Sequence, residues 1–110
     1  MVQKDRYRLV KIAESIAEFD FPENNLIEII TEDKSICLIK TSTGLKACAA
    51  KCPHAGGKMA HGKLDLKGNI VCCVHDYHFS LIHGRDSFNE GYFLKIYPVI
   101  TNKEGIFIGL

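Results

Sequence analysis

The sequence has no excess of charge of either sign, no long apolar run, no internal repeat and no low-complexity segment. Its 14 lysine and arginine residues nearly balance 13 acidic ones, so net charge gives no bulk attraction to nucleic acid or to an anionic membrane. No stretch approaches the length that spans a bilayer. Charges between Lys4 and Lys11 interrupt the apolar core that a signal peptide needs. We therefore expect a soluble, cytoplasmic protein.

The chain is also too short for a second domain and has the wrong cysteine count for a disulfide framework. Its 110 residues, 46% apolar and 25% charged, fit one ordinary globular domain spanning residues 1–110. The number of cysteines is odd, and disulfides are rare in the cytoplasm. The five are Cys37, Cys48, Cys52, Cys72 and Cys73. Metal binding is the leading explanation for some of them.

Sustained helical periodicity is scarce, and short apolar runs separated by turn residues dominate. One weak helical turn is expected within residues 12–21. Seven or eight short strands at this spacing indicate an all-β fold, an antiparallel sandwich or small barrel. The predicted strand segments are residues 7–12, 26–31, 36–41, 45–50, 69–73, 78–82, 92–101 and 105–110.

Two short clusters stand apart from the strands: "CPH", with Cys52 and His54, and "CCVH", with Cys72, Cys73 and His75. The spacing is Cys-x-His, then seventeen residues (55–71), then Cys-x-x-His. A single cysteine or histidine is usually just a packed or surface residue. Four in paired spacing on two loops are typical of a metal centre, and sulfur with imidazole nitrogen suits both Fe–S clusters and zinc.

This pattern resembles the Rieske [2Fe–2S] signature, in which two cysteines hold one iron and two histidines the other. The stretches "CPHAGG", "VCCVHDYHFSLIHG" and "EGYFLKIYPV" resemble those of Rieske-type ferredoxins from multicomponent oxygenase systems. The resemblance implies a β-sandwich base carrying a small cluster-binding subdomain, at about residues 49–84.

The same resemblance implies the cluster ligands. Cys52 and Cys72 would bind the buried iron of one [2Fe–2S] cluster, and His54 and His75 the outer iron. The family usually has a proline and then an aromatic residue between the second cysteine and histidine, where this chain has Cys73 and Val74. Cys73-x-His75 also mirrors Cys52-x-His54. We favour Cys72, because alternation sends the two cysteines to opposite faces and Cys-x-x-His matches the family. Cys73 would then be a packed bystander or a weak sulfur neighbour.

Resemblance also indicates a low reduction potential. High-potential respiratory Rieske proteins have a disulfide at the positions of Gly57 and Val74, a serine donor at that of Tyr77 and a tyrosine donor at that of Phe79. Phe79 cannot donate a hydrogen bond. We therefore expect a midpoint nearer −150 than +300 mV, within the span of roughly −150 to +300 mV for such centres.

The function implied by the resemblance is electron carriage rather than catalysis. A monomer would take one electron from a flavin-dependent reductase and deliver it to a terminal oxygenase through weak, transient contacts. Two alternatives remain: a Rieske-like small subunit of a larger redox enzyme such as a nitrite reductase, and a structural zinc module, since Cys₂His₂ sets also suit zinc. Lys58 and Lys63 could form a small positive docking patch or simply be solvated.

The remaining cysteines and histidines have structural interpretations. We expect core positions in strands for Cys37 and Cys48, and inward-facing strand positions for Phe79 and Leu81. Ordinary surface or strand positions are expected for His61, His78 and His83.

Overall fold

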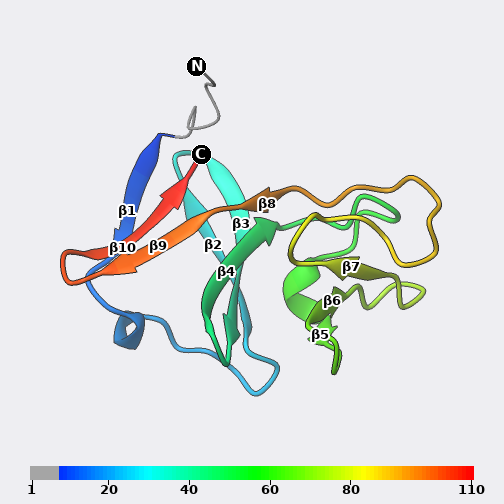
Figure 1. The fold of residues 1–110 in the computed structure, drawn as a ribbon, viewed down its shortest axis with the longest axis horizontal. Coiled ribbons are helices and arrows are strands. Elements are labelled where there is room, and N and C mark those ends of the chain that lie inside the picture. The colour runs from blue at the N-terminus through cyan, green and yellow to red at the C-terminus, as the bar shows by residue number, and fades with distance from the viewer. Residues whose placement is uncertain (1–7) are drawn as a thin grey trace.

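The computed structural model describes residues 8–110, and its strands confirm the all-β prediction (Figure 1). The described residues contain two short 3₁₀ turns and no α-helix, and none of their helices is long and apolar enough to cross a membrane. In chain order the elements are β1 (Leu9–Ala13), η1 (Ile16–Glu18), β2 (Leu26–Thr31), β3 (Lys34–Thr41), β4 (Gly44–Ala49), η2 (Met59–His61), β5 (Lys63–Leu64), β6 (Asn69–Val71), β7 (His78–Ser80), β8 (Ile96–Tyr97), β9 (Val99–Asn102) and β10 (Gly105–Gly109).

The predicted helical turn is η1, and each predicted strand segment contains part of at least one observed strand. The first strand was expected from Tyr7, which lies outside the described residues; β1 occupies Leu9–Ala13. β5, only two residues long, was not predicted.

Three antiparallel sheets make up the fold, in the orders β1-β10-β9, β2-β3-β4-β8 and β5-β6-β7. We call β1–β4 with β8–β10 the base, and residues 50–94, which hold η2 and β5–β7, the tip. In Figure 1 the tip lies at one end of the molecule, beyond β4 and β8.

The middle sheet β2-β3-β4-β8 is covered on both faces, and strand β3 shows why. Ile36 and Leu38 pack with Ile108 of β10, whereas Cys37 and Ile39 point to the other face and pack with residues of the tip. All four β3 side chains are fully buried. A continuous apolar run instead of strict alternation is what a strand buried on both sides requires. The core positions predicted for Cys37 and Cys48 are confirmed, and the two lie directly opposite each other on β3 and β4.

Side-chain hydrogen bonds reinforce the sheet of the tip, whose strands have only two or three residues. Asp65, in the β5–β6 turn, accepts from the backbone N–H groups of Lys67 and Asn69 at 2.8 and 2.9 Å. It also contacts His78 of β7 at 2.7 Å. Burial alone would raise the pKa of Asp65, but these hydrogen bonds, with Asn69 first, lower it to about 2.

Candidate metal centre

Two loops of the tip have the same closure. In the first, the Cys52 backbone N–H donates to the carbonyl of Gly57 at 2.8 Å. In the second, the Cys72 N–H donates to the carbonyl of Tyr77, also at 2.8 Å. Each bond joins a cysteine to the residue five positions later, so each loop turns back tightly just after its cysteine. In each loop the predicted cysteine ligand is the first residue, and the predicted histidine ligand, His54 or His75, lies within the loop.

Left-handed backbone conformations make these turns possible. Gly56 has φ 75°, a value that costs glycine little. In the second loop, His75 and Asp76 have φ 64° and 53°. Such values are uncommon for residues with a side chain, although His and Asp are among those that adopt them most often. The second loop is thus a strained turn, and it presents His75 to solvent.

The two cysteines are buried between the loops. Cys52 is 2% exposed and Cys72 is fully buried, and the Val74 N–H donates to the Cys72 sulfur at 3.4 Å. A Cβ added at Gly57 would lie 3.5 Å from that sulfur and 2.8 Å from Val74 Cγ2, so the loops meet closely there. Burial, followed by the neighbouring Cys52 thiol, raises the pKa of Cys72 to about 11 despite the Val74 N–H. Iron would deprotonate such a thiol on binding, because a metal cation favours the thiolate outright.

The two histidines lie on the outer side of the cysteines. Their ring centroids are 5.3 Å apart. Nδ1 of His54 is buried and has no hydrogen-bond partner, the only buried side-chain nitrogen or oxygen in residues 8–110 of which this is true. A buried ring nitrogen normally has a partner, so this atom is a free donor that a metal ion could take up. The described chain therefore offers two thiolates and two imidazoles, the donor set of a Rieske centre.

The structure brings like donors together, Cys52 beside Cys72 and His54 beside His75. Within the part of the chain that the structure describes, no three histidine, cysteine or acidic side chains converge to hold a single metal ion. A tetrahedral zinc needs four ligands at one centre, whereas a [2Fe–2S] cluster takes two from the protein at each iron. Two thiolates and two imidazoles are also a known zinc donor set, so the metal content of the purified protein decides between the two groups.

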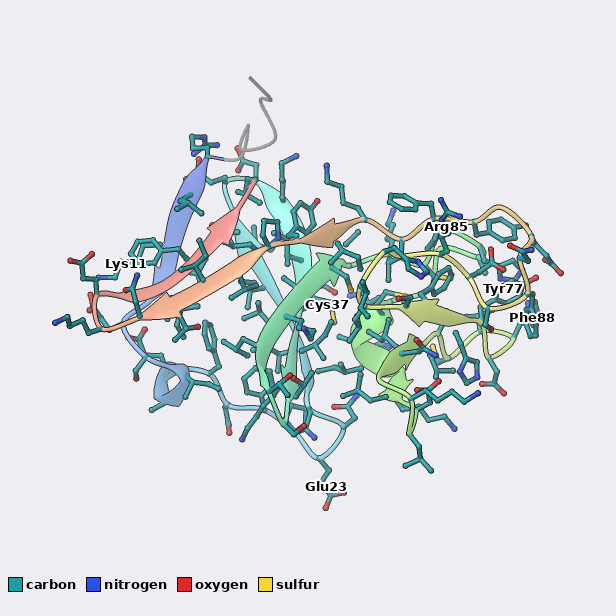
Figure 2. All side chains as sticks on the ribbon, in the orientation of Figure 1. Lys11, Glu23, Cys37, Tyr77, Arg85 and Phe88 are labelled. Atoms are coloured by element: carbon teal, nitrogen blue, oxygen red, sulfur yellow. The ribbon has the colours of Figure 1, made fainter. Side chains whose placement is uncertain are left out.

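Aromatic side chains surround His54, and sequence reasoning missed one of them. Tyr77 stacks on the His54 ring with centroids 3.8 Å apart and an interplanar angle of 18°. Tyr92, which had no role in the sequence interpretation, meets the same ring edge-on at 5.0 Å. The Tyr77 hydroxyl donates to Glu90, and this bond raises the Tyr77 pKa to about 12. Figure 2 shows Tyr77 and Phe88 together at the outer end of the tip.

A buried carboxylate fixes the loop that supplies these partners. Asp86, the only buried charged side chain in residues 8–110, accepts from the backbone N–H groups of Glu90 at 3.0 Å and Tyr92 at 2.8 Å. These bonds, with Glu90 first, lower the Asp86 pKa. Aspartate is a common turn residue, so the sequence alone gives Asp86 no special role. The burial of its side chain in the structure shows that it holds this loop.

Most residues expected to be bystanders lie away from the paired donors. Phe79 and Leu81 are buried as predicted. Among the other histidines, His61 and His83 are exposed and His78 pairs with Asp65 in strand β7. The expectation that Cys73 is packed is wrong: its side chain is exposed. Strand β6 ends at Val71, and Cys73 begins the turn after it, where its side chain is exposed to solvent.

Comparison with known proteins identifies the class of domain. Residues 12–89 match the Rieske [2Fe-2S] domain family. The chain therefore belongs to this family, whose domain binds a [2Fe–2S] cluster and transfers electrons. This confirms the resemblance drawn from the sequence. No curated protein matches the sequence.

Solved structures agree on the fold, and they include nitrite reductase small subunits and ferredoxins of oxygenase systems. One is assigned as an NADH-dependent nitrite reductase small subunit from Mycobacterium tuberculosis, with 17% identity, a TM-score of 0.79 and coverage of 96% of this chain and 97% of that one. Another is the ferredoxin of carbazole 1,9a-dioxygenase from Nocardioides aromaticivorans IC177, with 15% identity, a TM-score of 0.75 and coverage of 91% and 95%. A third, with 14% identity, a TM-score of 0.72 and coverage of 92% of each chain, comes from a complex of reduced oxygenase and oxidized ferredoxin in carbazole 1,9a-dioxygenase.

Proposed function

We propose that Cys52 and Cys72 hold the inner iron of the cluster and His54 and His75 the outer iron. The observation that carries this assignment is the partnerless buried Nδ1 of His54 between the two loops. The buried cysteines and the exposed His75 support the same order from inside to outside. In this assignment residues 49–84 form the cluster-binding subdomain of a single domain spanning residues 1–110.

Bound there, a [2Fe–2S] cluster supplies reversible one-electron chemistry, and the chain's own residues set its conditions. Cys52 and Cys72 lie in the same buried apolar cluster as Met59 and Phe79. This cluster keeps water away from the inner iron of the proposed site. The imidazoles leave the outer side close to solvent, which shortens the path to a partner. We propose that the protein is a monomeric cytoplasmic carrier, which passes one electron from a flavin-dependent reductase to a terminal oxygenase through transient contacts. The solved ferredoxins of similar fold support this role.

The residues near the proposed cluster favour a low potential. Hydrogen bonds to the sulfurs raise the potential of an iron–sulfur centre, yet Phe79 has no donor and the Tyr77 hydroxyl donates to Glu90 instead. Gly57 and Val74 carry no sulfur, so no disulfide can form between these two positions beside the cluster. We expect a midpoint nearer −150 than +300 mV, within the span of roughly −150 to +300 mV. A redox titration giving a midpoint well above zero contradicts this.

The test of the ligand assignment is a matched pair of cysteine variants. The purified protein should be red-brown and contain two irons and two labile sulfides per chain, which a colourless protein with stoichiometric zinc would refute. Cys72→Ser should abolish the visible spectrum and the Rieske electron paramagnetic resonance signal, because it removes an inner-iron ligand. Cys73→Ser should retain both. Reversed outcomes would mean that Cys73 is the ligand.

A second function is favoured by the similar fold assigned as a nitrite reductase small subunit. In that case the domain would stay attached to a larger enzyme rather than shuttle between partners. Purification of the tagged protein from its native host distinguishes the two. A stoichiometric large partner that survives gel filtration supports the subunit, and a cluster-loaded monomer supports the carrier.

A further inference from the structure

Two lysines face each other beside the loop that carries His54. Lys51 and Lys58 lie directly opposite in an antiparallel bridge, and the loop from Cys52 to Gly57 connects them. Directly opposed residues project to the same side, with Cβ atoms about 4.5–5.5 Å apart. Both side chains are exposed. We call Lys51 and Lys58 the lysine pair.

The lysine pair brings no benefit to the fold. Like charges directly opposite across two strands destabilise the pairing, and exposed lysines also lose side-chain freedom when they are held together. Residues 8–110 contain three ion pairs, and neither lysine takes part in one. The bridge needs only the backbone, so a neutral or acidic residue would serve at either position.

Charge is distributed unevenly along the chain, and the tip is short of free carboxylates. Residues 12–33, in the base, contain seven acidic residues and no lysine or arginine. Residues 50–94 contain five basic and four acidic residues. Of these acids, Asp65 and Asp86 are engaged by backbone N–H groups and Glu90 accepts from Tyr77. Asp76 lines a hollow with Lys63, beside the second loop. Within residues 8–110, the lysine pair therefore has no carboxylate that neutralises it.

We propose that the lysine pair is a docking point for an acidic surface of the protein's redox partner, with a partner carboxylate between the two ammonium groups. This inference rests on the proposed function, because it needs an electron leaving or entering beside His54. Such a contact would hold the partner against the loop that carries His54 and raise the association rate at low salt. It would add little affinity, as suits a transient encounter.

The test uses the cluster-loaded protein and two redox proteins of opposite charge as probes. The first is an acidic flavodoxin: its hydroquinone gives one electron to the oxidised protein and becomes the semiquinone. The second is basic cytochrome c, whose ferric haem takes one electron from the reduced protein. Stopped-flow absorbance gives both rate constants at low ionic strength and at high ionic strength.

The informative variant is Lys51→Glu, because it separates docking from folding. It converts the repulsive pair into a cross-strand ion pair with Lys58, so the melting temperature should stay the same or rise. The flavodoxin rate should nevertheless fall by about fivefold at low salt, and the cytochrome c rate should rise. Both differences should shrink at high salt, because ions screen exposed charges.

Lys103→Glu is the matched control, since it makes the same change of net charge in the exposed β9–β10 turn, at the end of the base away from the tip (Figure 1). It should change either rate by less than about 1.5-fold, because the Coulomb interaction weakens with distance and Lys103 lies far from the proposed docking point. Equal effects of the two variants, or no effect of either, would overturn the proposal. So would Lys51-dependent binding to duplex DNA or anionic vesicles with an unchanged flavodoxin rate. Absence of the cluster spectrum in the unmutated protein would instead reject the proposed function.

Discussion

The base and the tip are built in different ways. The base has strands of up to eight residues, and aliphatic side chains such as Ile36, Leu38 and Ile108 pack between its sheets. The tip has strands of two or three residues. Its interior mixes Phe79 and Ile70 with sulfur-bearing side chains, and its loops depend on the carboxylates Asp65 and Asp86. In Figure 2, Cys37 lies between the two parts.

This difference indicates that the base is stable by burial, whereas the tip needs its ligand. Apolar burial scales with the area removed from water, and long strands supply it along their length. Isolated two- or three-residue strands supply little. A metal cluster bound by two loops would add the missing stabilisation. Its ligands come together only when the loops fold, so the free energy of binding is also free energy of folding. The strained turn at His75 and Asp76 then lies where binding energy can maintain it.

Removal of the cluster should therefore separate the two parts, and this is the largest effect that we expect. Cys52→Ser removes an inner-iron ligand, so no cluster should assemble. The free energy of opening of residues 50–94 should then fall by more than about 5 kcal/mol. Amide hydrogen exchange measured residue by residue should show protection lost in β6 and β7 and kept in β3 and β10.

Cys73→Ser provides the control, since it also replaces a cysteine of the tip but one that is exposed. It should leave exchange in both parts unchanged. If Cys52→Ser leaves β6 and β7 as protected as before, the tip does not depend on a cluster and the comparison fails.

Much of the base could be predicted from the sequence, because its strands carry long apolar runs. The run around Cys37 identified a buried strand, and the two cysteines assigned to the core are there. β5 was missed because a pair of residues carries no periodic pattern. The two-sided burial of the middle sheet also depends on contacts between distant segments, which a local pattern does not encode.

The proposed site divides in the same way. Cysteine and histidine spacing pointed to the paired loops, and the structure places the candidate side chains close together. The conformation of residues 86–92 was not predictable, since it depends on the buried Asp86 carboxylate. That loop brings Tyr92 to His54, so the surroundings of a predicted ligand came from a segment with no metal-binding pattern. The exposure of Cys73 was missed because strand alternation indicates which face a side chain lies on, but not whether other residues cover that face.

A cavity made in the tip should destabilise mainly the tip, whereas a cavity made in the base should destabilise the whole domain. Phe79 is fully buried in β7, and Phe79→Ala should cost about 3–5 kcal/mol. The loss should appear mainly as faster cluster release and faster exchange in β6. Ile108→Ala, in β10, should cost about 2–5 kcal/mol and lower the midpoint of global unfolding in urea. If Phe79→Ala accelerates exchange in β10 as much as in β6, the two parts form one cooperative unit.

The smallest of these effects concerns pH and the β5–β6 turn. Asp65 has a pKa of about 2 in the folded protein, below its unfolded value of about 3.9. Its carboxylate therefore stabilises the tip fully above pH 4, and this contribution is lost as pH falls from about 4 towards 2.

Asp65→Ala should cost about 1–2 kcal/mol at pH 7, because two backbone N–H groups lose their acceptor. Asp65→Asn, which retains an acceptor without the charge, should lower stability less and flatten its dependence on pH between 4 and 2. Half-times of cluster loss at pH 7, 4.5 and 3 measure both variants against the unmutated protein, so acid lability common to all three cancels. Parallel pH curves for the unmutated protein and Asp65→Asn would show that the Asp65 charge has no part in holding the turn.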